Sequence, residues 1–226
     1  MCIPDGITWR DLDMMNCCQC QGIEELFDDQ LVNRELLRFR DRGPTRETKM
    51  LITALEERGV QGDTLLDIGG GVGAVQYGLL EAGCQVATDV DASRAYLRAA
   101  GEEAGRRGLT DRISYHHGNF VDLAPDIAPA DIVTLDRVIC CYPDVEKLVS
   151  LSADRAGKLY GLVFPRDGWL TRVGFSILNF IMRLRRSSFR IFPHSTRAVE
   201  ALIASHGLRK VFYRRSLLWQ VIVYSR

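Results

Sequence analysis

Residues 65–73 read Leu-Leu-Asp-Ile-Gly-Gly-Gly-Val-Gly, and this stretch decides the fold. An apolar run over 64–68 ends in the glycine cluster, and apolar residues at helical spacing follow over 72–80. This order predicts a strand, a tight turn and a helix, which is the first unit of a nucleotide-binding α/β sheet. Because glycine has no Cβ, the turn lets the backbone approach a ligand closely. We therefore expect a ligand at the carboxyl end of this strand, where Asp67 adds a carboxylate.

Two classes of ligand compete for the glycine turn. Gly69-x-Gly71-x-x-Ala74 satisfies a relaxed dinucleotide pattern, which would make the protein an NAD-dependent oxidoreductase with pyrophosphate at the helix N-terminus. Asp67 argues against that ligand, because a carboxylate beside the loop repels a pyrophosphate. The acid instead favours a ligand that has a cationic end and no phosphate.

The same residues, written Asp67-x-Gly69-x-Gly71-x-Gly73, resemble the first motif of the class I S-adenosylmethionine (SAM) methyltransferases. SAM carries a cationic amino acid end and a sulfonium, so it suits the acid. The resemblance implies that SAM is the cofactor and that Asp67 and the glycine loop, with Gly70, contact it.

The second predicted strand, residues 85–91, ends in acids about 20 residues after the glycines, as ribose binding requires. Val90-Asp91-Ala92-Ser93 resembles the family's Val-Asp-x-Ser, which implies that Asp91 and Ala92 lie at the ribose. Asp89 is the alternative ribose ligand. Ser93 is expected to cap the helix that follows.

The third and fourth strands, over 112–120 and 131–136, carry the remaining motifs. The family ends the third strand with Gly-Asp-hydrophobic and binds the adenine amine there, whereas this chain has Asn119 followed by Phe120. An amide oxygen still accepts from that amine, and Phe120 is expected to pack on the adenine. Asp136 ends the fourth strand and joins the expected cofactor set. The stretch 137–144 after it resembles the fourth motif, which faces cofactor and substrate.

That fourth stretch reads Cys140-Cys141-Tyr142-Pro143 and lacks the Asp/Asn-Pro-Pro-aromatic quartet that often marks methylation of base or amide nitrogens. Methyl transfer to O, S, C or a metalloid in a small molecule remains, and among these we expect oxygen or sulfur of a small, apolar molecule. Tyr142 and Cys141 are the candidate catalytic residues there. His194, beyond Pro193, is a further candidate, as a general base.

The rest of the chain completes an α/β fold. Helices are predicted over 145–153 and 196–205, a fifth strand over 159–164, and two strands over 210–216 and 218–224 with almost nothing between them. We expect a Rossmann-like, mostly parallel seven-stranded sheet with a terminal antiparallel hairpin and helices on both faces. The resemblance covers roughly residues 45–226.

Residues 1–44 precede that region. Apolar residues recur at helical spacing from Ile23 to Phe39, so we expect one helix with one buried face. The resemblance implies a lid over the cofactor, and a helix packed on the sheet edge is the alternative. We divide the chain into a helical extension or lid at 1–44 and a SAM-binding domain at 45–226.

Five cysteines form two groups, Cys17, Cys18 and Cys20 before the expected lid and Cys140 and Cys141 after the fourth strand. Closing the lid would bring these thiols together, and thiolates suit zinc, copper(I) or a metalloid. Two alternative functions follow: thiol-assisted methylation of a metalloid such as arsenite, and a catalytically silent SAM-fold metal sensor. Cys-Cys-x-Cys is not a zinc-finger spacing, so packing is the default and no metal is assigned.

The helical insertion near 166–195 is nearly continuously apolar and then rich in arginine. It predicts a cover over an apolar substrate or a transient membrane-surface contact through 169–190, and a helix buried on the sheet is the alternative. The chain here resembles magnesium-protoporphyrin and quinone O-methyltransferases, which implies a large apolar acceptor.

Composition sets the remaining expectations. The chain has 226 residues, 46% of them hydrophobic, and a formal net charge of +0, so it can bury one core and has no global attraction for nucleic acid. Charged residues over 5–13 interrupt any signal-peptide core, so we expect a cytoplasmic protein whose seven cysteines are reduced thiols. The expected partner is a small-molecule substrate, and no obligate protein partner is inferred.

Overall fold

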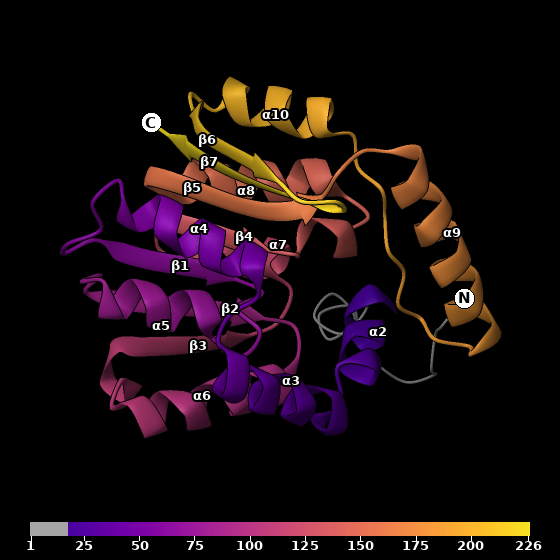
Figure 1. The fold of residues 1–226 in the computed structure, drawn as a ribbon, viewed down its shortest axis with the longest axis horizontal. Helices are drawn as coiled ribbons and strands as arrows, with labels where there is room; N and C mark the ends of the chain where they lie inside the picture. Colours follow the sequence, from indigo (N-terminus) through magenta and orange to yellow (C-terminus); the bar gives the residue numbers. More distant parts are fainter. Residues whose placement is uncertain (1–17) are drawn as a thin grey trace.

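A seven-stranded sheet forms the centre of the computed structural model, which describes residues 18–226. The strand order is β3-β2-β1-β4-β5-β7-β6 (Figure 1). The expected fold class is confirmed. The strands are β1 (Thr64–Ile68), β2 (Val86–Asp91), β3 (Ile113–His117), β4 (Ala130–Asp136), β5 (Ala156–Pro165), β6 (Arg209–Arg215) and β7 (Trp219–Ser225).

Strands β1 to β5 pair in parallel, and β7 inserts antiparallel between β5 and β6. The reversal follows from the sequence, because only three residues, 216–218, connect β6 to β7 and a parallel crossover needs a dozen or more. The strand order reverses at β1, since the chain runs outward to β3 and then returns to β4 on the other side of β1. Such a switch point leaves a crevice at the carboxyl ends of the central strands, where α/β folds bind ligands.

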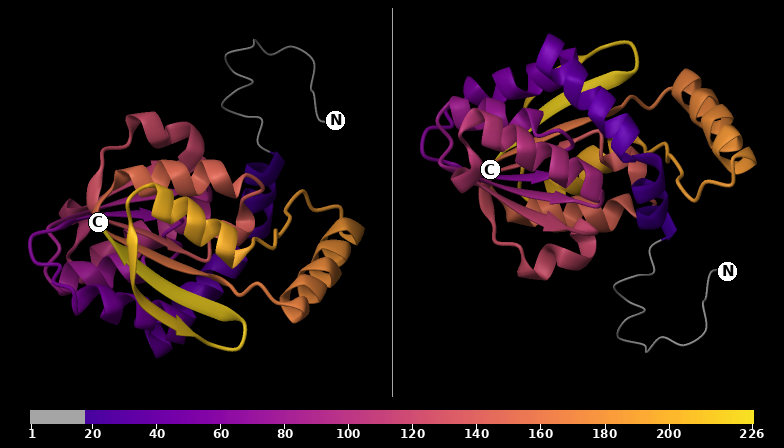
Figure 2. Two further views of the ribbon diagram at one scale, coloured as in Figure 1. Left: turned by 90° about the horizontal axis from the view of Figure 1, so that it is seen from above. Right: turned by 90° about the horizontal axis from the view of Figure 1, so that it is seen from below.

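Helices cover both faces of the sheet (Figure 2). One face buries apolar residues of four helices and the other buries those of three, which gives two separate apolar cores. The first set is α3 (Asp29–Arg42), α4 (Arg46–Glu56), α5 (Ala74–Glu81) and α6 (Arg94–Arg107), and the second is α7 (Phe120–Leu123), α8 (Val145–Arg155) and α10 (Thr196–Ser205). Short 3₁₀ turns lie at Thr110–Arg112, Ala124–Asp126 and Ile139–Cys141.

The single helix expected over 23–39 is wrong, because the structure breaks it into α2 (Cys18–Leu26) and α3. The break has a local cause: the Asp28 side chain accepts a hydrogen bond from the backbone N–H of Leu31 at 2.8 Å and so caps a new helix. The two pieces differ in burial. Helix α3 buries Val32, Leu36 and Phe39 in the first core and is therefore part of the folded body.

Helix α9 (Trp169–Leu184) lies at the side of the molecule, beside α2 and away from the sheet (Figure 1). None of its 16 residues is buried. The alternative that this segment is a helix buried on the sheet is therefore wrong. Among the described residues, no helix is long and apolar enough to cross a membrane.

Candidate cofactor and substrate site

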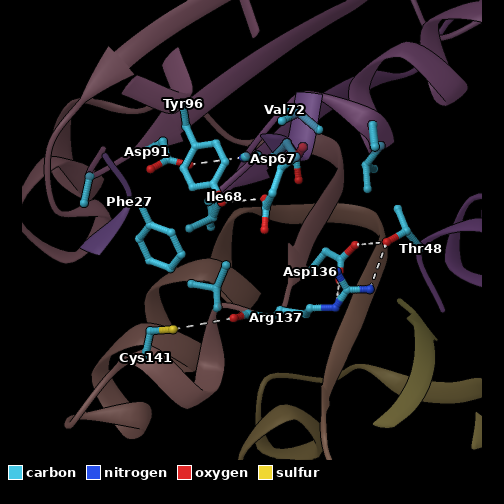
Figure 3. A pocket seen from close by; sticks show the side chains of 18 of the residues that line it. Phe27, Thr48, Asp67, Ile68, Val72, Asp91, Tyr96, Asp136, Arg137 and Cys141 are labelled. Atoms are coloured by element: carbon cyan, nitrogen blue, oxygen red, sulfur yellow. Dashed lines mark hydrogen bonds and ion pairs between the residues drawn. The ribbon is translucent and has the colours of Figure 1, made fainter. Parts of the chain in front are cut away.

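A cavity of about 280 Å³ opens at the carboxyl ends of β1, β2 and β4. Its floor is the glycine turn after β1, and its far wall comes from α2, α3 and the start of α4. The β4 end supplies a third wall through residues 136–138, 141 and 142. The cavity thus occupies the switch point that the strand order creates, and Figure 3 shows the side chains that face it.

The glycine turn needs its glycines for two different reasons. Gly69, Gly71 and Gly73 have φ of 69°, 58° and 84°, which disfavours any residue with a Cβ. A Cβ on Gly70 would lie 2.2 Å from Gln76 Nε2, and a Cβ on Gly73 would lie 2.4 Å from the Tyr77 hydroxyl. Neighbouring side chains therefore occupy the space that a larger residue would need at these two positions. A Cβ on Gly71 would meet only the Tyr96 ring, at 3.9 Å.

The turn therefore leaves open space above Gly71 for a ligand. Gly69, Gly70 and Gly71 line the cavity, as expected from the sequence. Gly73 does not line it; this residue begins α5 and packs against Tyr77.

Two acids at the end of β2 hold the glycine turn from below. Asp91 Oδ2 accepts a hydrogen bond from the Gly71 N–H at 3.2 Å, and Asp89 Oδ1 accepts one from the Gly70 N–H at 3.3 Å. Asp91 and Ala92 line the cavity, whereas Asp89 is 0% exposed and lies beneath the turn. Burial raises the pKa of both carboxyls. The geometry places Asp91, the expected ribose ligand, at the cavity, and Asp89 in a supporting position.

Asp67 lies deeper, at the end of β1, and is 1% exposed. Its carboxylate accepts hydrogen bonds from Thr134 Oγ1 at 2.7 Å and from Gln76 Nε2 at 3.3 Å. Burial outweighs these two bonds and raises the pKa of Asp67 to about 7. The side chain faces the cavity between Ile68 and Val72 (Figure 3).

The β3 end differs from the expectation at Asn119. Phe120 and Gly118 line the cavity, but Asn119 does not. Its Oδ1 accepts from the Val121 N–H at 3.2 Å and its Nδ2 donates to Asp122 at 2.7 Å, so the amide caps the short helix α7. The expectation that Asn119 receives the adenine amine is therefore not supported in this structure, because the helix start already uses the side chain.

The β4 end presents Asp136 to the cavity. Its Oδ2 accepts a hydrogen bond from Thr48 Oγ1 at 2.5 Å. Its Oδ1 is buried without a hydrogen bond among the described residues, with Arg137 Nε at 3.7 Å. Burial raises the pKa of this carboxyl. Arg137 itself has φ of 65°, bonds Thr45 Oγ1, and faces the same space (Figure 3).

The wall opposite the glycine turn comes from the N-terminal helices, where the sequence predicted a lid, but none of its side chains was among the expected site residues. Phe27 packs against Tyr96 with ring centroids 5.3 Å apart, and the Tyr96 hydroxyl donates to Glu35 at 2.6 Å. Arg38 also lines the cavity, and within residues 18–226 it makes no hydrogen bond or ion pair. These residues lie outside the glycine motif, so the spacing of that motif does not predict them as site residues.

The three candidate catalytic residues separate in the structure. Cys141 and Tyr142 line the cavity. His194 does not: it lies in a separate small pocket, where its Nε2 is 2.8 Å from the Tyr142 carbonyl oxygen, and burial lowers its pKa. The His194 imidazole therefore contacts the backbone behind the Tyr142 side of the cavity. It does not line the cavity and so is not placed to act there as a base.

The cysteines of the expected soft-ion site are only partly described. Cys140 Sγ and Cys141 Sγ are 4.0 Å apart, and this hydrogen bond lowers the pKa of Cys140 and raises that of Cys141. Cys17 and the side chains of Cys18 and Cys20 lie outside the described residues. Among the described residues, no group of three or more His, Cys, Asp or Glu side chains is arranged to hold a metal ion.

Comparison with known proteins agrees with this geometry. The family model described as "Methyltransferase domain" matches residues 66–156. Residues 66–156 of this chain therefore resemble a methyltransferase domain. The matched range runs from β1 through β5's first residue and so includes the glycine turn, the β2 acids and the β4 end.

Three known methyltransferases illustrate what this chain is similar to. The ribosomal protein L11 methyltransferase of Erwinia tasmaniensis is 27% identical over 112 residues, which cover 50% of this chain and 37% of that protein. The crystal structure of magnesium protoporphyrin IX methyltransferase from Synechocystis with bound S-adenosylhomocysteine (SAH) has a TM-score of 0.68 at 15% identity and covers 92% of this chain and 99% of that one. An O-methyltransferase family protein from Burkholderia thailandensis gives 0.67 at 15% identity, over 96% and 68% of the two chains. The resemblance to class I SAM-dependent methyltransferases is thus confirmed for the domain and the fold.

The cavity residues fit SAM on three counts. The space above Gly71 admits a ligand against the backbone, Asp91 offers a carboxylate beside it, and Asp136 Oδ1 is a buried acceptor that lacks a hydrogen-bond donor. A buried acceptor of this kind is costly unless a donor arrives, and the ammonium of SAM is such a donor. The same carboxylates disfavour a pyrophosphate, because like charges repel each other.

Proposed function

We propose that the protein transfers the methyl group of SAM to oxygen or sulfur of a small apolar molecule. The observation that carries this proposal is one cavity with two unlike halves. The half at the strand ends holds Asp67, Asp91 and Asp136 around the glycine turn. The other half is largely apolar, with Ile23, Phe27, Phe39, Val138 and Tyr142, although Glu35 and Thr45 also line the cavity.

In this proposal the strand-end half binds and orients SAM. Asp91 accepts the ribose hydroxyls, Phe120 packs on the adenine and the ammonium lies at Asp136. Arg38, which has no partner in the described chain, pairs with the carboxylate of the cofactor. SAM supplies an electrophilic methyl group whose transfer is an in-line displacement.

The apolar half aligns the acceptor with that methyl group. Such a displacement depends chiefly on alignment and on exclusion of water, so a dedicated base is not required. Phe27 and Tyr96 close the cavity on the α2 side, and Cys141 and Tyr142 form the wall beside the β4 end. The side chains of these residues select an apolar acceptor by shape.

The experiment is a thermal-shift and calorimetric titration with SAH. SAH should raise the melting temperature, and Asp91→Asn should weaken its affinity about tenfold to a hundredfold, because a hydrogen bond to a charged group is worth about 1.5–3 kcal/mol. Asp111→Asn, an exposed acid remote from the cavity, is the matched control and should bind like the wild type. Equal affinity of Asp91→Asn and wild type excludes Asp91 as the ribose ligand, and stabilisation by NADH in place of SAH contradicts the whole proposal.

A second candidate is thiol-assisted methylation of a metalloid. The specific observation is the adjacent thiol pair, with Sγ atoms 4.0 Å apart and Cys141 at the cavity wall. Two adjacent thiolates suit a soft trivalent centre such as arsenite. If this function is correct, arsenite protects Cys140 and Cys141 from thiol titration in the wild type and leaves Cys140 reactive in Cys141→Ser. Unchanged thiol reactivity leaves the apolar organic acceptor.

A further inference from the structure

Helix α9 presents a long apolar stripe to solvent. Trp169, Val173, Ile177, Phe180 and Leu184 recur every three or four residues, which places them on one face. Trp169 is 73% exposed, Phe180 is 62% exposed and Leu184 is 68% exposed. Contiguous exposed apolar side chains on the surface of a folded domain mark an interaction surface.

The side of α9 that faces the rest of the chain is a different one. Asn179 Nδ2 donates to the Ile191 carbonyl oxygen at 2.7 Å, and the Ile191 N–H donates to Asn179 Oδ1 at 2.9 Å. At 100° per residue, Asn179 points well away from the stripe that Val173 and Ile177 form. The apolar stripe is therefore oriented outward by the fold and is not the packing face of the helix.

Positive charge surrounds the stripe. Residues 166–190 hold six arginines and one acid, Asp167, which gives this segment a net charge of +5 in a chain whose net charge is +0. Arg183, Arg185 and Arg186 cluster at the end of the helix and are exposed. The apolar stripe and the arginines are thus on one protruding element (Figure 2).

A second apolar element lies at the other end of α9. Leu217 and Leu218, at the tip of the β6–β7 hairpin, are 81% and 49% exposed. The Arg166 N–H donates to the Leu218 carbonyl oxygen at 2.8 Å, which holds the tip beside the residues that lead into α9. The hairpin tip therefore places two further exposed apolar side chains near the start of α9.

We infer that α9, with the hairpin tip, docks on the surface of a membrane that contains anionic lipids. An interfacial helix needs one apolar face, flanking arginines and no spanning length, and α9 has all three. The arginines select this occupant, because anionic headgroups neutralise them, whereas a second copy of the chain would bring another segment of +5 to the contact. This docking does not depend on the proposed methyl transfer.

The docked helix is connected to the cavity wall. After α9 the chain returns along residues 185–195, where the Phe192 N–H donates to the Cys140 carbonyl oxygen at 2.8 Å. In the same stretch Phe189 is 2% exposed and packs edge-on against Phe27, with ring centroids 5.9 Å apart. The return segment therefore joins the docked helix to the α2 side of the cavity.

Vesicle flotation with the full chain tests the inference. The protein should float with vesicles of equal parts phosphatidylcholine and phosphatidylglycerol, stay behind with phosphatidylcholine alone, and detach as salt rises. Ile177→Ser/Phe180→Ser should abolish flotation. The control Leu37→Ser, on α3 and equally solvent-exposed at 62%, should float like the wild type.

The charge is tested separately. Arg183→Gln/Arg185→Gln/Arg186→Gln should lower the affinity for the anionic vesicles about a hundredfold, from the attraction of about three surface arginines. The matched triple variant Arg34→Gln/Arg42→Gln/Arg98→Gln removes the same charge from exposed arginines on α3 and α6 and should bind like the wild type. Circular dichroism checks that each variant is folded.

Three outcomes overturn the inference. The folded wild type fails to float with anionic vesicles, or the two control variants lose flotation as fully as the α9 variants do. In the third, sedimentation shows a dimer that Ile177→Ser/Phe180→Ser dissociates, with no flotation, which makes a second copy the occupant. Each of these readings is obtained without SAM or SAH, so none is confused with failure of the methyl-transfer proposal.

Discussion

Asp67 links the site to pH through a single buried carboxyl. Burial raises its pKa from 3.8 to about 7, so the folded protein without ligand holds a proton that the unfolded chain releases above pH 3.8. The stabilisation of the folded state from this group is therefore full below about pH 4 and is lost as pH rises through about 7. The charge of Asp136 also raises the pKa of Asp67. A cationic ligand at Asp136 therefore favours the ionised form of the Asp67 carboxylate.

We therefore expect the affinity for SAH to rise with pH, about tenfold per unit below pH 7, and to level off above it. Calorimetry between pH 5.5 and 8.5, in buffers of different ionisation enthalpy, measures both the affinity and the proton released. Asp67→Asn has no carboxyl to titrate and should flatten the profile. A variant that keeps the slope of the wild type would assign the titration to Asp91 or Asp136, whose pKa values are also raised by burial.

Among the site residues, the sequence identified those that a local motif marks. Asp67, the glycines and Asp91 lie beside strand ends that the hydrophobic pattern predicts, so their meeting follows from the topology of a parallel sheet. Arg38, Thr48 and Tyr96 were missed because helix packing alone brings them to the cavity. Asn119 and His194 were assigned by motif or loop position, and their hydrogen bonds direct them to a helix cap and to the Tyr142 carbonyl.

The positions of the strands were predicted closely from the sequence, whereas the bounds of the N-terminal helices were not. The apolar periodicity from 23 to 39 continues across the break at Asp28, although only α3 buries its apolar side chains and Ile23 and Leu26 of α2 are half-buried. The Asp28 cap divides α2 from α3. An aspartate within a helical pattern does not by itself predict the start of a new helix. The break matters because α2 covers the cavity while α3 is core.

Gly22 is the point where α2 meets the return segment after α9. A Cβ at this position would lie 2.3 Å from the Phe189 backbone nitrogen and 2.7 Å from its Cα, and neither atom can move as a flexible side chain would. Gly22→Ala should therefore displace α2, separate Phe27 from Phe189 and open the cavity, which lowers the affinity for SAH without unfolding the sheet. Calorimetry with SAH and limited proteolysis near α2 measure the two effects.

Gly174→Ala is the matched control for that prediction. Gly174 also lies within a helix, and a Cβ there would meet nothing within 4 Å. The substitution should leave the affinity for SAH unchanged and stabilise α9 by up to about 1 kcal/mol through helix propensity. If Gly22→Ala also leaves the affinity unchanged, α2 does not cover the cofactor.

The sequence predicted the central sheet but not the placement of the peripheral helices. Strand order follows from the alternation of strands and helices and from the short hairpin connection, both of which are local. The position of α9 depends on a few contacts made by Asn179 and Phe189, and composition alone does not choose between a buried cover and an outward helix. The absence of any buried residue in α9 decides that question.

The division between α2 and α3 gives the last prediction. Deleting residues 1–27 removes α2 and the cavity wall at Ile23 and Phe27 and leaves the core intact. This shortened chain should unfold cooperatively near the temperature of the full chain, with weaker SAH binding. Deleting residues 1–45 also removes Val32, Leu36 and Phe39 from the first core.

Each of those three side chains contributes about 1.5–3 kcal/mol by burial, so the longer deletion costs on the order of 5 kcal/mol, comparable with the whole stability of a small domain. The longer deletion also removes Arg40, which pairs at 2.7 Å with Glu103, a carboxylate that is 0% exposed. Chemical denaturation of both shortened chains, followed by circular dichroism, compares their free energies of unfolding. A chain starting at residue 46 that unfolds at the same denaturant concentration as the full chain would show that α3 is a detachable lid and that the boundary at residue 44 separates two structural units.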